Sequence, residues 1–435
     1  MKEYEIYSEY SCDKFYEEFE KRRTLTTISV DTAVKDILEN VKSRGDSAVL
    51  DYTMTFDGAR MTAKEMRVRP GEIFEARSQL ALSMLSTLQN AADNIREFHE
   101  HELEKSWSMT KDNGSRIGIR VTPIKVAGVY VPGGRAPLPS SVLMNIIPAK
   151  VAGVEKIVMC TPPGRDGKIN PAILAAAGIA GVDEIYKVGG AQAIAAMAYG
   201  TEMIPKCDKI TGPGNAYVAA AKKAVFGTVG IDMIAGPSEI LIIADETADP
   251  SYVAADMLSQ AEHDPMAASV LITTSEDLAE AVKPLIEMEL GQLVREDIAR
   301  ASIDKNGTII VTGSIDTAVK IANRIAPEHL EIIAKNEEEI LHKVQNAGAV
   351  FLGKWSPEPM GDYYCGTNHV LPTGGTARYS SPLGVWDFLK RTSIINYTKE
   401  DFINEAEEVV LFAKEEGLGA HAYSITRRME DIEDE

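Results

Sequence analysis

Residues 126–160 read VAGVYVPGGRAPLPSSVLMNIIPAKVAGVEKIVMC, and this stretch decides the fold class. It begins with an apolar run typical of a buried strand, passes through a Gly/Pro-rich turn, and ends with a second apolar run. The segment between predicts a helix with a kink at Pro148. A strand, a helix and a further strand at this spacing indicate a right-handed βαβ unit of a parallel sheet.

The alternation of apolar strands and helices continues along the chain. Further strands are predicted at EIYKV, DKIT, EILIIAD, ASVLITT and GTIIVTG, with helices between them such as Pro250 to Ala261. The pattern predicts an α/β fold with two Rossmann-like, incomplete doubly wound domains and small helical terminal segments. Gly71 to Glu104 is expected to form one long helix, with His99 and His101 on its solvated surface.

Four segments follow from this pattern. We expect a charged N-terminal arm at residues 1–25, a larger α/β domain at 26–124 and 239–381, an inserted α/β domain at 125–238, and a C-terminal helical segment at 382–435.

The composition limits the classes of function. Of 435 residues, 45% are hydrophobic and 25% are charged, as in ordinary globular proteins. The formal net charge of −20 disfavours nucleic acid or an anionic membrane as the main partner. The first residues carry acids where a signal peptide needs a basic and then an apolar stretch, so we expect a cytoplasmic protein. The four cysteines are far apart and are expected to be free thiols, namely Cys12, Cys160, Cys207 and Cys365.

Three strand-to-helix turns are candidates for nucleotide binding, because ligands of parallel sheets bind at the carboxyl ends of strands. These turns are residues 132–134, 189–192 and 212–215. The chain contains neither the dinucleotide fingerprint nor the P-loop motif. In TGPGNAY, two glycines and Asn215 precede a helix whose first N–H groups suit a pyrophosphate. The alternative is that Gly and Pro only make the turn.

A metal site is suggested by ADMLSQAEHDP, a predicted helix that ends near Pro265. Gln260 and His263 are three residues apart and share one face of this helix. Imidazole suits Zn²⁺ well, whereas an amide oxygen is a less usual ligand. Asp362 and His421 lie on Gly-flanked turns and are further candidates. The alternative is that Gln260 and His263 are surface residues, and the pattern alone does not bring the four candidates together.

An acid–base pair is suggested by APEHLEI, where Glu328 and His329 follow Pro327. An adjacent carboxylate and imidazole could divide two proton transfers between them. The alternative is a helix start, with proline in the first turn and the glutamate complementing the helix dipole. His369 lies in NHVLPTGGTARYSSP, a Gly/Ser/Thr loop of the kind that often lines sites.

Taken together, these segments resemble the histidinol dehydrogenases from about residue 25 to the end. The resemblance is carried, in the family's order, by GVYVPGGRAPLPSSVLMNIIPAKVAGV, VGGAQAIAAMAYGT, KITGPGNAYVAAAKK, AGPSEILIIADE, AADMLSQAEHDP, APEHLEI and NHVLPTGGTARYSSPLGVWDF. It implies that L-histidinol is oxidised through an aldehyde to L-histidine by two NAD⁺ molecules, the last steps of histidine biosynthesis. It also implies one Zn²⁺ per subunit, and a homodimer in which the C-terminal segment completes the partner's site.

The resemblance also implies roles for residues at matching positions. The implied zinc ligands are Gln260, His263, Asp362 and His421. His329 matches the base that takes the alcohol proton, and Glu328 matches the residue that activates water towards the aldehyde. The implied substrate contacts are Ser238, Gln260, His263, His329, Asp362, His369, Glu416 and His421. The implied NAD contacts are Tyr130, Gln192 and Asn215.

Two alternatives differ in function. Relatives of the same fold, such as sulfopropanediol dehydrogenase, oxidise other small alcohols and need not hold an imidazole and an amine. Glu416, His369 and the SSPLGVWDF run favour histidinol. A non-catalytic binding or scaffold protein is disfavoured, because all the implied zinc and acid–base positions are filled. Thr367 stands where we would more often expect proline, but it is not an implied ligand.

Overall fold

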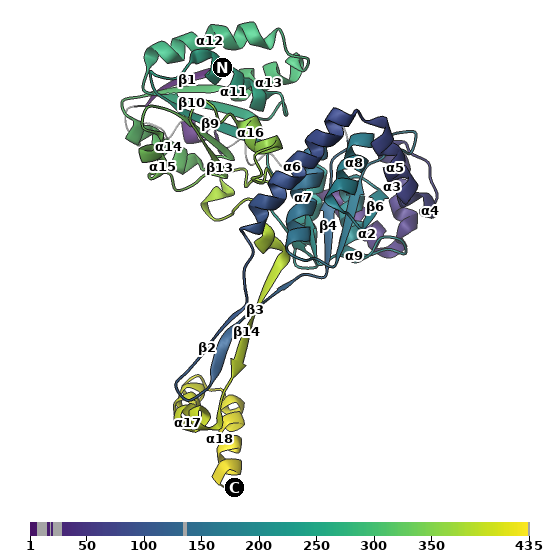
Figure 1. Ribbon diagram of the computed structural model, residues 1–435, viewed down its shortest axis with the longest axis vertical. Helices are drawn as coiled ribbons and strands as arrows, with labels where there is room; N and C mark the ends of the chain where they lie inside the picture. Colours follow the sequence, from purple (N-terminus) through teal and green to yellow (C-terminus); the bar gives the residue numbers. More distant parts are fainter. Residues whose placement is uncertain (7–14, 18, 21–27, 134–136, 434–435) are drawn as a thin grey trace. The chain divides into compact units, whose positions relative to one another are not determined.

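The computed structural model describes residues 1–6, 15–17, 19–20, 28–133 and 137–433, and it divides into two compact units (Figure 1). The first unit comprises residues 1–102 and 124–388, and the second comprises residues 103–123 and 389–435. Two parallel sheets lie in the first unit and an antiparallel sheet lies in the second. Among the described residues, no helix has the length and apolar character needed to cross a membrane.

A five-stranded parallel sheet in the first unit has the order β6-β5-β4-β7-β8. Its strands are β4 (Val126–Tyr130), β5 (Lys156–Thr161), β6 (Glu184–Lys187), β7 (Lys209–Thr211) and β8 (Gly230–Ile231). The chain starts in the centre, adds two strands on one side, and then crosses to the other side, as in half of a Rossmann fold. The topological switch point therefore lies between β4 and β7.

This sheet is covered by helices that precede its first strand and by helices that lie between its strands. They are α2 (Ile28–Arg44), α3 (Asp46–Asp57), α4 (Ala63–Met66), α5 (Pro70–Gln79), α6 (Leu82–Glu100), α7 (Pro139–Val151), α8 (Pro171–Ala180), α9 (Gly190–Tyr199) and α10 (Ala216–Val225). The sequence assigned residues 28–100 to the larger domain, but Val34 and Val41 of α2 share a core with Ile194 and Val218. The single long helix expected at 71–104 is two helices, because residues 80 and 81 are extended.

A six-stranded parallel sheet has the order β1-β11-β10-β9-β12-β13. Its strands are β1 (Lys2–Ile6), β9 (Glu239–Ala244), β10 (Ala268–Thr273), β11 (Thr308–Thr312), β12 (His329–Ile333) and β13 (Ala349–Leu352). Without β1, the order repeats that of the five-stranded sheet. The predicted N-terminal arm is thus partly wrong: β1 is an edge strand of this sheet, and Phe15, Tyr16 and Phe19 are buried in its core. Residues 7–14, 18 and 21–25 of that arm lie outside the described residues.

Two cores enclose the six-stranded sheet. Its helices are α11 (Pro250–Ala261), α12 (Glu276–Leu290), α13 (Glu296–Asn306), α14 (Ile315–Ile325), α15 (Glu337–Leu341) and α16 (Glu358–Tyr363), followed by the 3₁₀ turns η2 (Thr376–Arg378) and η3 (Val385–Phe388). One core joins the sheet to α11, α12 and α13 (Figure 1), and the other joins it to α14 and to Phe15, Tyr16 and Phe19. The predicted helix from Pro250 to Ala261 is confirmed, with Asp249 as its N-cap.

The second unit contains an antiparallel sheet of order β14-β3-β2 and two helices. Its elements are β2 (Trp107–Thr110), β3 (Arg116–Pro123), β14 (Leu389–Asn396), α17 (Lys399–Glu415) and α18 (Gly419–Glu433). The expectation that residues 382–435 are helical is wrong for β14, which pairs with β3 from Leu389 opposite Pro123 to Asn396 opposite Arg116. A partner so distant in sequence leaves no local signal.

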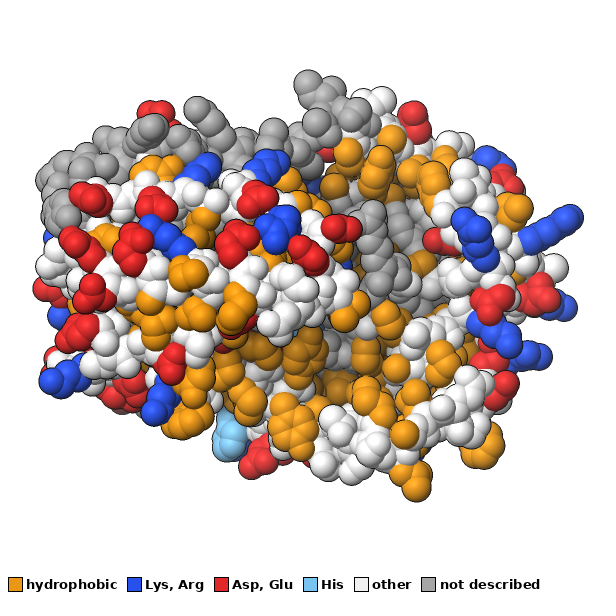
Figure 2. Space-filling view, turned by 90° about the horizontal axis from the view of Figure 1, so that it is seen from above, with side chains coloured by type: hydrophobic (Ala, Val, Ile, Leu, Met, Phe, Trp, Pro, Cys, Tyr) orange, Lys and Arg blue, Asp and Glu red, His pale blue; other side chains and the backbone are white. Residues whose placement is uncertain are grey.

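The face shown in Figure 2 carries acidic and basic side chains in mixture. Red and blue side chains are mixed towards the two sides of this view, whereas hydrophobic side chains predominate in its lower middle. Among the residues drawn in colour, this face therefore offers no broad positive surface.

The turn after β7 is held by a buried ion pair. Lys222 and Asp232 form a salt bridge, and their side chains are only 2% and 1% exposed. Lys222 Nζ also donates to the Gly212 carbonyl at 2.9 Å, and Asp232 accepts from the Gly212 N–H at 2.8 Å. Gly212 has φ 117°, and a Cβ there would lie 2.0 Å from the carbonyl oxygen of Tyr130. Only glycine fits this turn.

Replacing the buried lysine should therefore destabilise the protein. We expect Lys222→Met to lower the free energy of unfolding by about 3–5 kcal/mol, because it leaves Asp232 buried without a counter-charge. The neighbouring Lys223 is exposed, so Lys223→Met is a matched control and should change that energy by less than about 0.5 kcal/mol. Denaturant unfolding measures both variants. Equal effects would contradict the role given to the ion pair.

Candidate active site

Glu328 and His329 lie at the amino end of β12, an interior strand of the six-stranded sheet. They start a strand, so the alternative of a helix start is wrong. Helix α14 ends at Ile325, and Ala326 turns the chain with φ 52°, the one positive φ of a non-glycine residue in the described part of the chain. Glu328 and His329 are only 6% and 3% exposed. Ligands of parallel sheets were expected at the carboxyl ends of strands, whereas this pair lies at an amino end.

The backbone of Glu239, at the start of β9, binds both residues of the pair. Its N–H donates to Glu328 Oε2 at 2.8 Å, and its carbonyl lies 3.0 Å from His329 Nδ1. A carbonyl can only accept, so Nδ1 carries the proton, a tautomer inferred from this bond. In neutral His329 the lone pair is then on Nε2, which is buried without a hydrogen-bond partner among the described residues. In that neutral form, Nε2 could accept a proton, as a general base must.

Two carboxylates of α16 face that nitrogen. His329 Nε2 lies 3.5 Å from Asp362 Oδ1 and 3.9 Å from Glu358 Oε1. One ligand atom from each of these three side chains lies within 4.8 Å of the others, a spacing that could hold a metal ion. Asp362 was predicted as a site residue from the sequence, but Glu358 was not. The signal was present, because residues four apart share one face of a helix.

The pKa values reflect the excess of negative charge around one imidazole. Burial raises the pKa of Glu328 to about 7, against the opposing effect of His329. Burial alone would lower the pKa of His329, but the carboxylates of Glu328 and Asp362 raise it to about 10. Burial and the nearby Asp362 raise the pKa of Glu358 to about 8. A bound cation would neutralise much of this charge.

Helix α11 brings two further candidate ligands to the same region. Ser259 Oγ donates to Glu358 Oε2 at 3.2 Å, which links α11 to α16. The next residue, Gln260, is fully buried, and neither its amide oxygen nor its amide nitrogen has a hydrogen-bond partner among the described residues. His263 is exposed, but it is close enough to Asp362 and His329 to interact with their charges. A buried amide without a partner is costly, so Gln260 suits a ligand that the protein would bind.

His369 connects α16 to α7. Its Nδ1 lies 3.0 Å from the Asp362 carbonyl, and its Nε2 lies 3.2 Å from Ser141 Oγ. The preceding Asn368 is bonded to Nε2 of His99 at 3.2 Å. His99 is therefore fully buried, and the expectation of a solvated surface residue is wrong. Its partner is 269 residues away, so local sequence could not reveal it.

Three other predicted site residues, all in the described part of the chain, make no contact that the structure records with the imidazole of His329 or the two carboxylates facing it. Ser238 directly precedes Glu239 and is half-buried. Glu416 and His421 belong to the second unit, at the end of α17 and in α18, and both are exposed.

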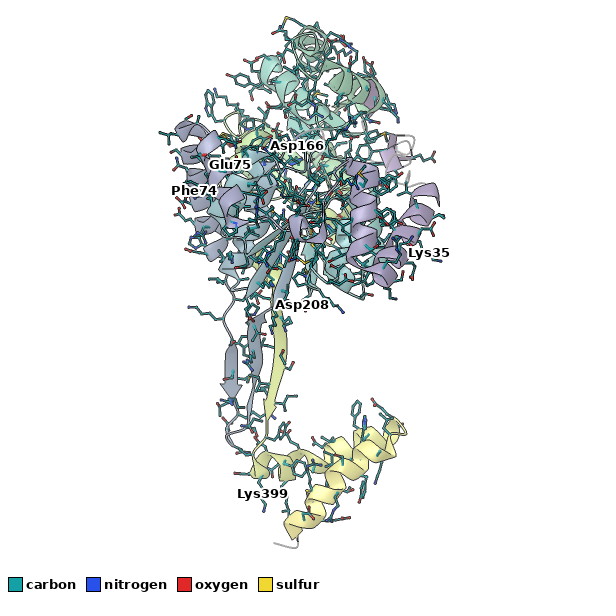
Figure 3. All side chains as sticks on the ribbon, turned by 90° about the vertical axis from the view of Figure 1, so that its right-hand side faces the viewer. Lys35, Phe74, Glu75, Asp166, Asp208 and Lys399 are labelled. Atoms are coloured by element: carbon teal, nitrogen blue, oxygen red, sulfur yellow. The ribbon has the colours of Figure 1, made fainter. Side chains whose placement is uncertain are left out.

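The predicted NAD contacts lie at the carboxyl ends of the five-stranded sheet, around its switch point. Tyr130 ends β4, and its hydroxyl accepts from the Gly190 N–H at 3.1 Å. Gln192 is 1% exposed, and its amide has no hydrogen-bond partner among the described residues. Asn215 is the N-cap of α10. At the opposite end, Asp208 (Figure 3) accepts from the N–H groups of residues 125 and 126 at 3.0 and 2.9 Å, which closes that end.

Comparisons with known proteins agree with this architecture. The sequence model of the family "Histidinol dehydrogenase" matches residues 20–429. The chain is 53% identical to histidinol dehydrogenase of Heliobacterium mobile over 94% of its length and 96% of the relative's. It is 53% identical to that of Bacillus subtilis (strain 168) over 91% of this chain and 92% of the relative. The crystal structure of histidinol dehydrogenase from Elizabethkingia anophelis superposes with a TM-score of 0.88 at 42% identity, covering 92% of each chain. The chain belongs to the histidinol dehydrogenase family.

Proposed function

We propose that this protein oxidises L-histidinol through L-histidinaldehyde to L-histidine, with Zn²⁺ and two molecules of NAD⁺. The observation that supports it most is the buried Glu328–His329 pair, which faces Asp362 beside the unpartnered amide of Gln260. The proposed zinc ligands are Gln260, His263, Asp362 and His421. Family membership supports the substrate, and these contacts support the division of roles.

The residues present fit a zinc ion. They offer an imidazole, a carboxylate and an amide oxygen, and the Gln260 amide is buried without any other partner in the described structure. When bound, Zn²⁺ supplies the positive charge that holds the imidazole and amine of the substrate in place. Ser238, His369 and Glu416 are proposed to complete the substrate contacts.

His329 is the proposed base of the first oxidation. The hydroxyl proton of histidinol passes to Nε2 while the carbon gives up its hydride, which leaves the aldehyde. The Glu239 carbonyl accepts from Nδ1 of His329 at 3.0 Å. This bond fixes the orientation of the ring, so Nε2 keeps facing the side of Asp362 during the reaction. NAD⁺ supplies the hydride acceptor.

Glu328 is the proposed base of the second half-reaction. It takes a proton from water as the water oxygen bonds to the aldehyde carbon, and the resulting hydrate gives up a second hydride to become the acid. The Glu239 N–H holds its carboxylate at 2.8 Å. Cys160 and Cys207 are buried free thiols, and the exposed Cys365 has its Sγ 3.0 Å from Thr367 Oγ1, so we propose the route through water and not through a thiohemiacetal.

The nucleotide is proposed to bind at the switch point of the five-stranded sheet, through Tyr130, Gln192 and Asn215. The unpartnered Gln192 amide at the carboxyl end of this sheet supports this placement. We further propose a cytoplasmic homodimer in which the C-terminal segment, with Glu416 and His421, completes the site of the partner.

The first measurement is the NADH formed per molecule of limiting L-histidinol. We expect two NADH, because one active site is proposed to perform both oxidations, and we expect a chelator to abolish the reaction. One NADH would contradict the second step. Turnover of an acidic small alcohol in place of histidinol would contradict the substrate.

Substitutions of the acid–base pair should separate the two steps. We expect His329→Asn to lower kcat for histidinol by about 10²–10⁴-fold, because the alcohol then lacks its base. Glu328→Gln should slow the oxidation of added histidinaldehyde by a similar factor and slow the first NADH far less. The exposed Glu338 provides the control Glu338→Gln, which should change neither rate. Impairment of only the first step in Glu328→Gln would show that the roles are misassigned.

Substitution of Gln260 should separate metal binding from stability. We expect Gln260→Met to weaken Zn²⁺ binding by at least about 100-fold, since even outer-shell partners typically contribute 10–100-fold. The metal-free variant should be at least as stable as the unaltered protein, because it removes a buried amide without partners. Chelator competition and denaturant unfolding test both points. Gln292→Met, at an exposed position, is the control.

A further inference from the structure

Glu331 is a buried glutamate that the proposed chemistry does not use. It follows His329 by two residues on β12, so both side chains lie on the same face of the strand. Ile333, on that face, packs in the core formed with α11. Glu331 is only 1% exposed. A carboxyl in such a core requires hydrogen-bond partners to offset its lost hydration.

The first partner of Glu331 is the amino end of α16. Its Oε1 accepts from the Glu358 N–H at 2.7 Å. Glu358 is the first residue of α16, and the N-cap position is Pro357, which makes no side-chain capping bond. The first N–H groups of a helix lack partners within the helix, and they favour an acceptor. Glu331, on strand β12, thus caps helix α16, which carries Asp362.

The second neighbour of Glu331 is Asp256 on α11. Burial and the Asp256 carboxyl raise the pKa of Glu331 well above its usual value, and Glu331 Oε2 is buried without a donor among the described residues. Two carboxyls can share a hydrogen bond only if one of them holds a proton. Burial also raises the pKa of Asp256 to about 6, which agrees with a retained proton. Asp256 precedes Gln260 by four residues, so both lie on one face of α11.

These two contacts join the two helices that carry the proposed metal ligands of the first unit. We propose that Glu331 is a positioning residue that fixes α11 relative to α16, and thereby sets the spacing of Gln260, His263 and Asp362. The proposal rests on the proposed function in so far as these three residues bind zinc. Glu331 itself contacts neither metal nor substrate, and it acts through the backbone of one helix and a side chain of the other.

Three variants of the full-length protein test this role. Glu331→Leu removes both contacts. Glu331→Gln keeps them, because the amide oxygen can accept from the Glu358 N–H and the amide nitrogen can donate to the Asp256 carboxylate. Leu330→Ala is the matched control: Leu330 is fully buried on the same strand but faces the opposite core, so it loses stability without touching these contacts.

The first readout is hydrogen exchange of the backbone amides of residues 358–363 in metal-free protein. We expect exchange at least about tenfold faster in Glu331→Leu, because α16 loses its cap, and near the unaltered rate in Glu331→Gln and Leu330→Ala. The second readout is Zn²⁺ affinity by chelator competition. We expect a loss of roughly 10–100-fold in Glu331→Leu, and rescue to within about threefold in Glu331→Gln.

Unchanged exchange and zinc affinity in Glu331→Leu would overturn the proposal, and so would equal zinc losses in Glu331→Leu and Leu330→Ala. Should Glu331→Leu not fold, Asp256→Ala removes the α11 contact alone from a half-buried position and should still weaken zinc binding. Failure of the unaltered protein to bind zinc would contradict the proposed function. The exchange comparison would then still decide whether Glu331 fixes α16.

Discussion

Both members of the proposed acid–base pair depend on the backbone of a single residue. The N–H of Glu239 binds Glu328, and its carbonyl binds the ring of His329. Glu239 belongs to β9, which pairs in parallel with β12, with His329 opposite Ile240. The register of two interior strands therefore sets the direction of both side chains. A slip of one residue would remove both bonds at once and turn each side chain to the other face of the sheet.

The two parallel sheets share one strand order, but their proposed functional residues lie at opposite ends. In the five-stranded sheet, Asp208 closes the amino end, and the proposed nucleotide contacts follow the carboxyl ends. In the six-stranded sheet, Asp245 closes the carboxyl end by accepting from the Lys335 N–H at 2.8 Å, and the acid–base pair lies at the amino end. Strand order alone therefore does not locate a site. The polar bonds that close one end of a sheet indicate which end remains for ligands.

Much of the fold could be predicted because its signals are local. Apolar runs bounded by Gly and Pro predicted β4 and the neighbouring strands. Helix α11 begins at Pro250 and ends at Ala261, as predicted. What failed depended on distant partners. The burial of His99 requires Asn368, and β14 requires β3. For the site, residue types suggested its members, but only the fold shows that Glu358 lies beside Asp362.

Ala326 shows how the chain prepares this site. A non-glycine residue in the left-handed region costs of order 1–3 kcal/mol. Glycine would remove that cost, but it would also let the peptide between α14 and β12 sample many more conformations. Alanine restricts the directions in which the chain can leave the helix, so the two following functional side chains are oriented before any ligand arrives. A substitution that relieved the strain at this position would therefore weaken the preorganisation of the two side chains. Engineering for heat resistance would face this trade-off at Ala326.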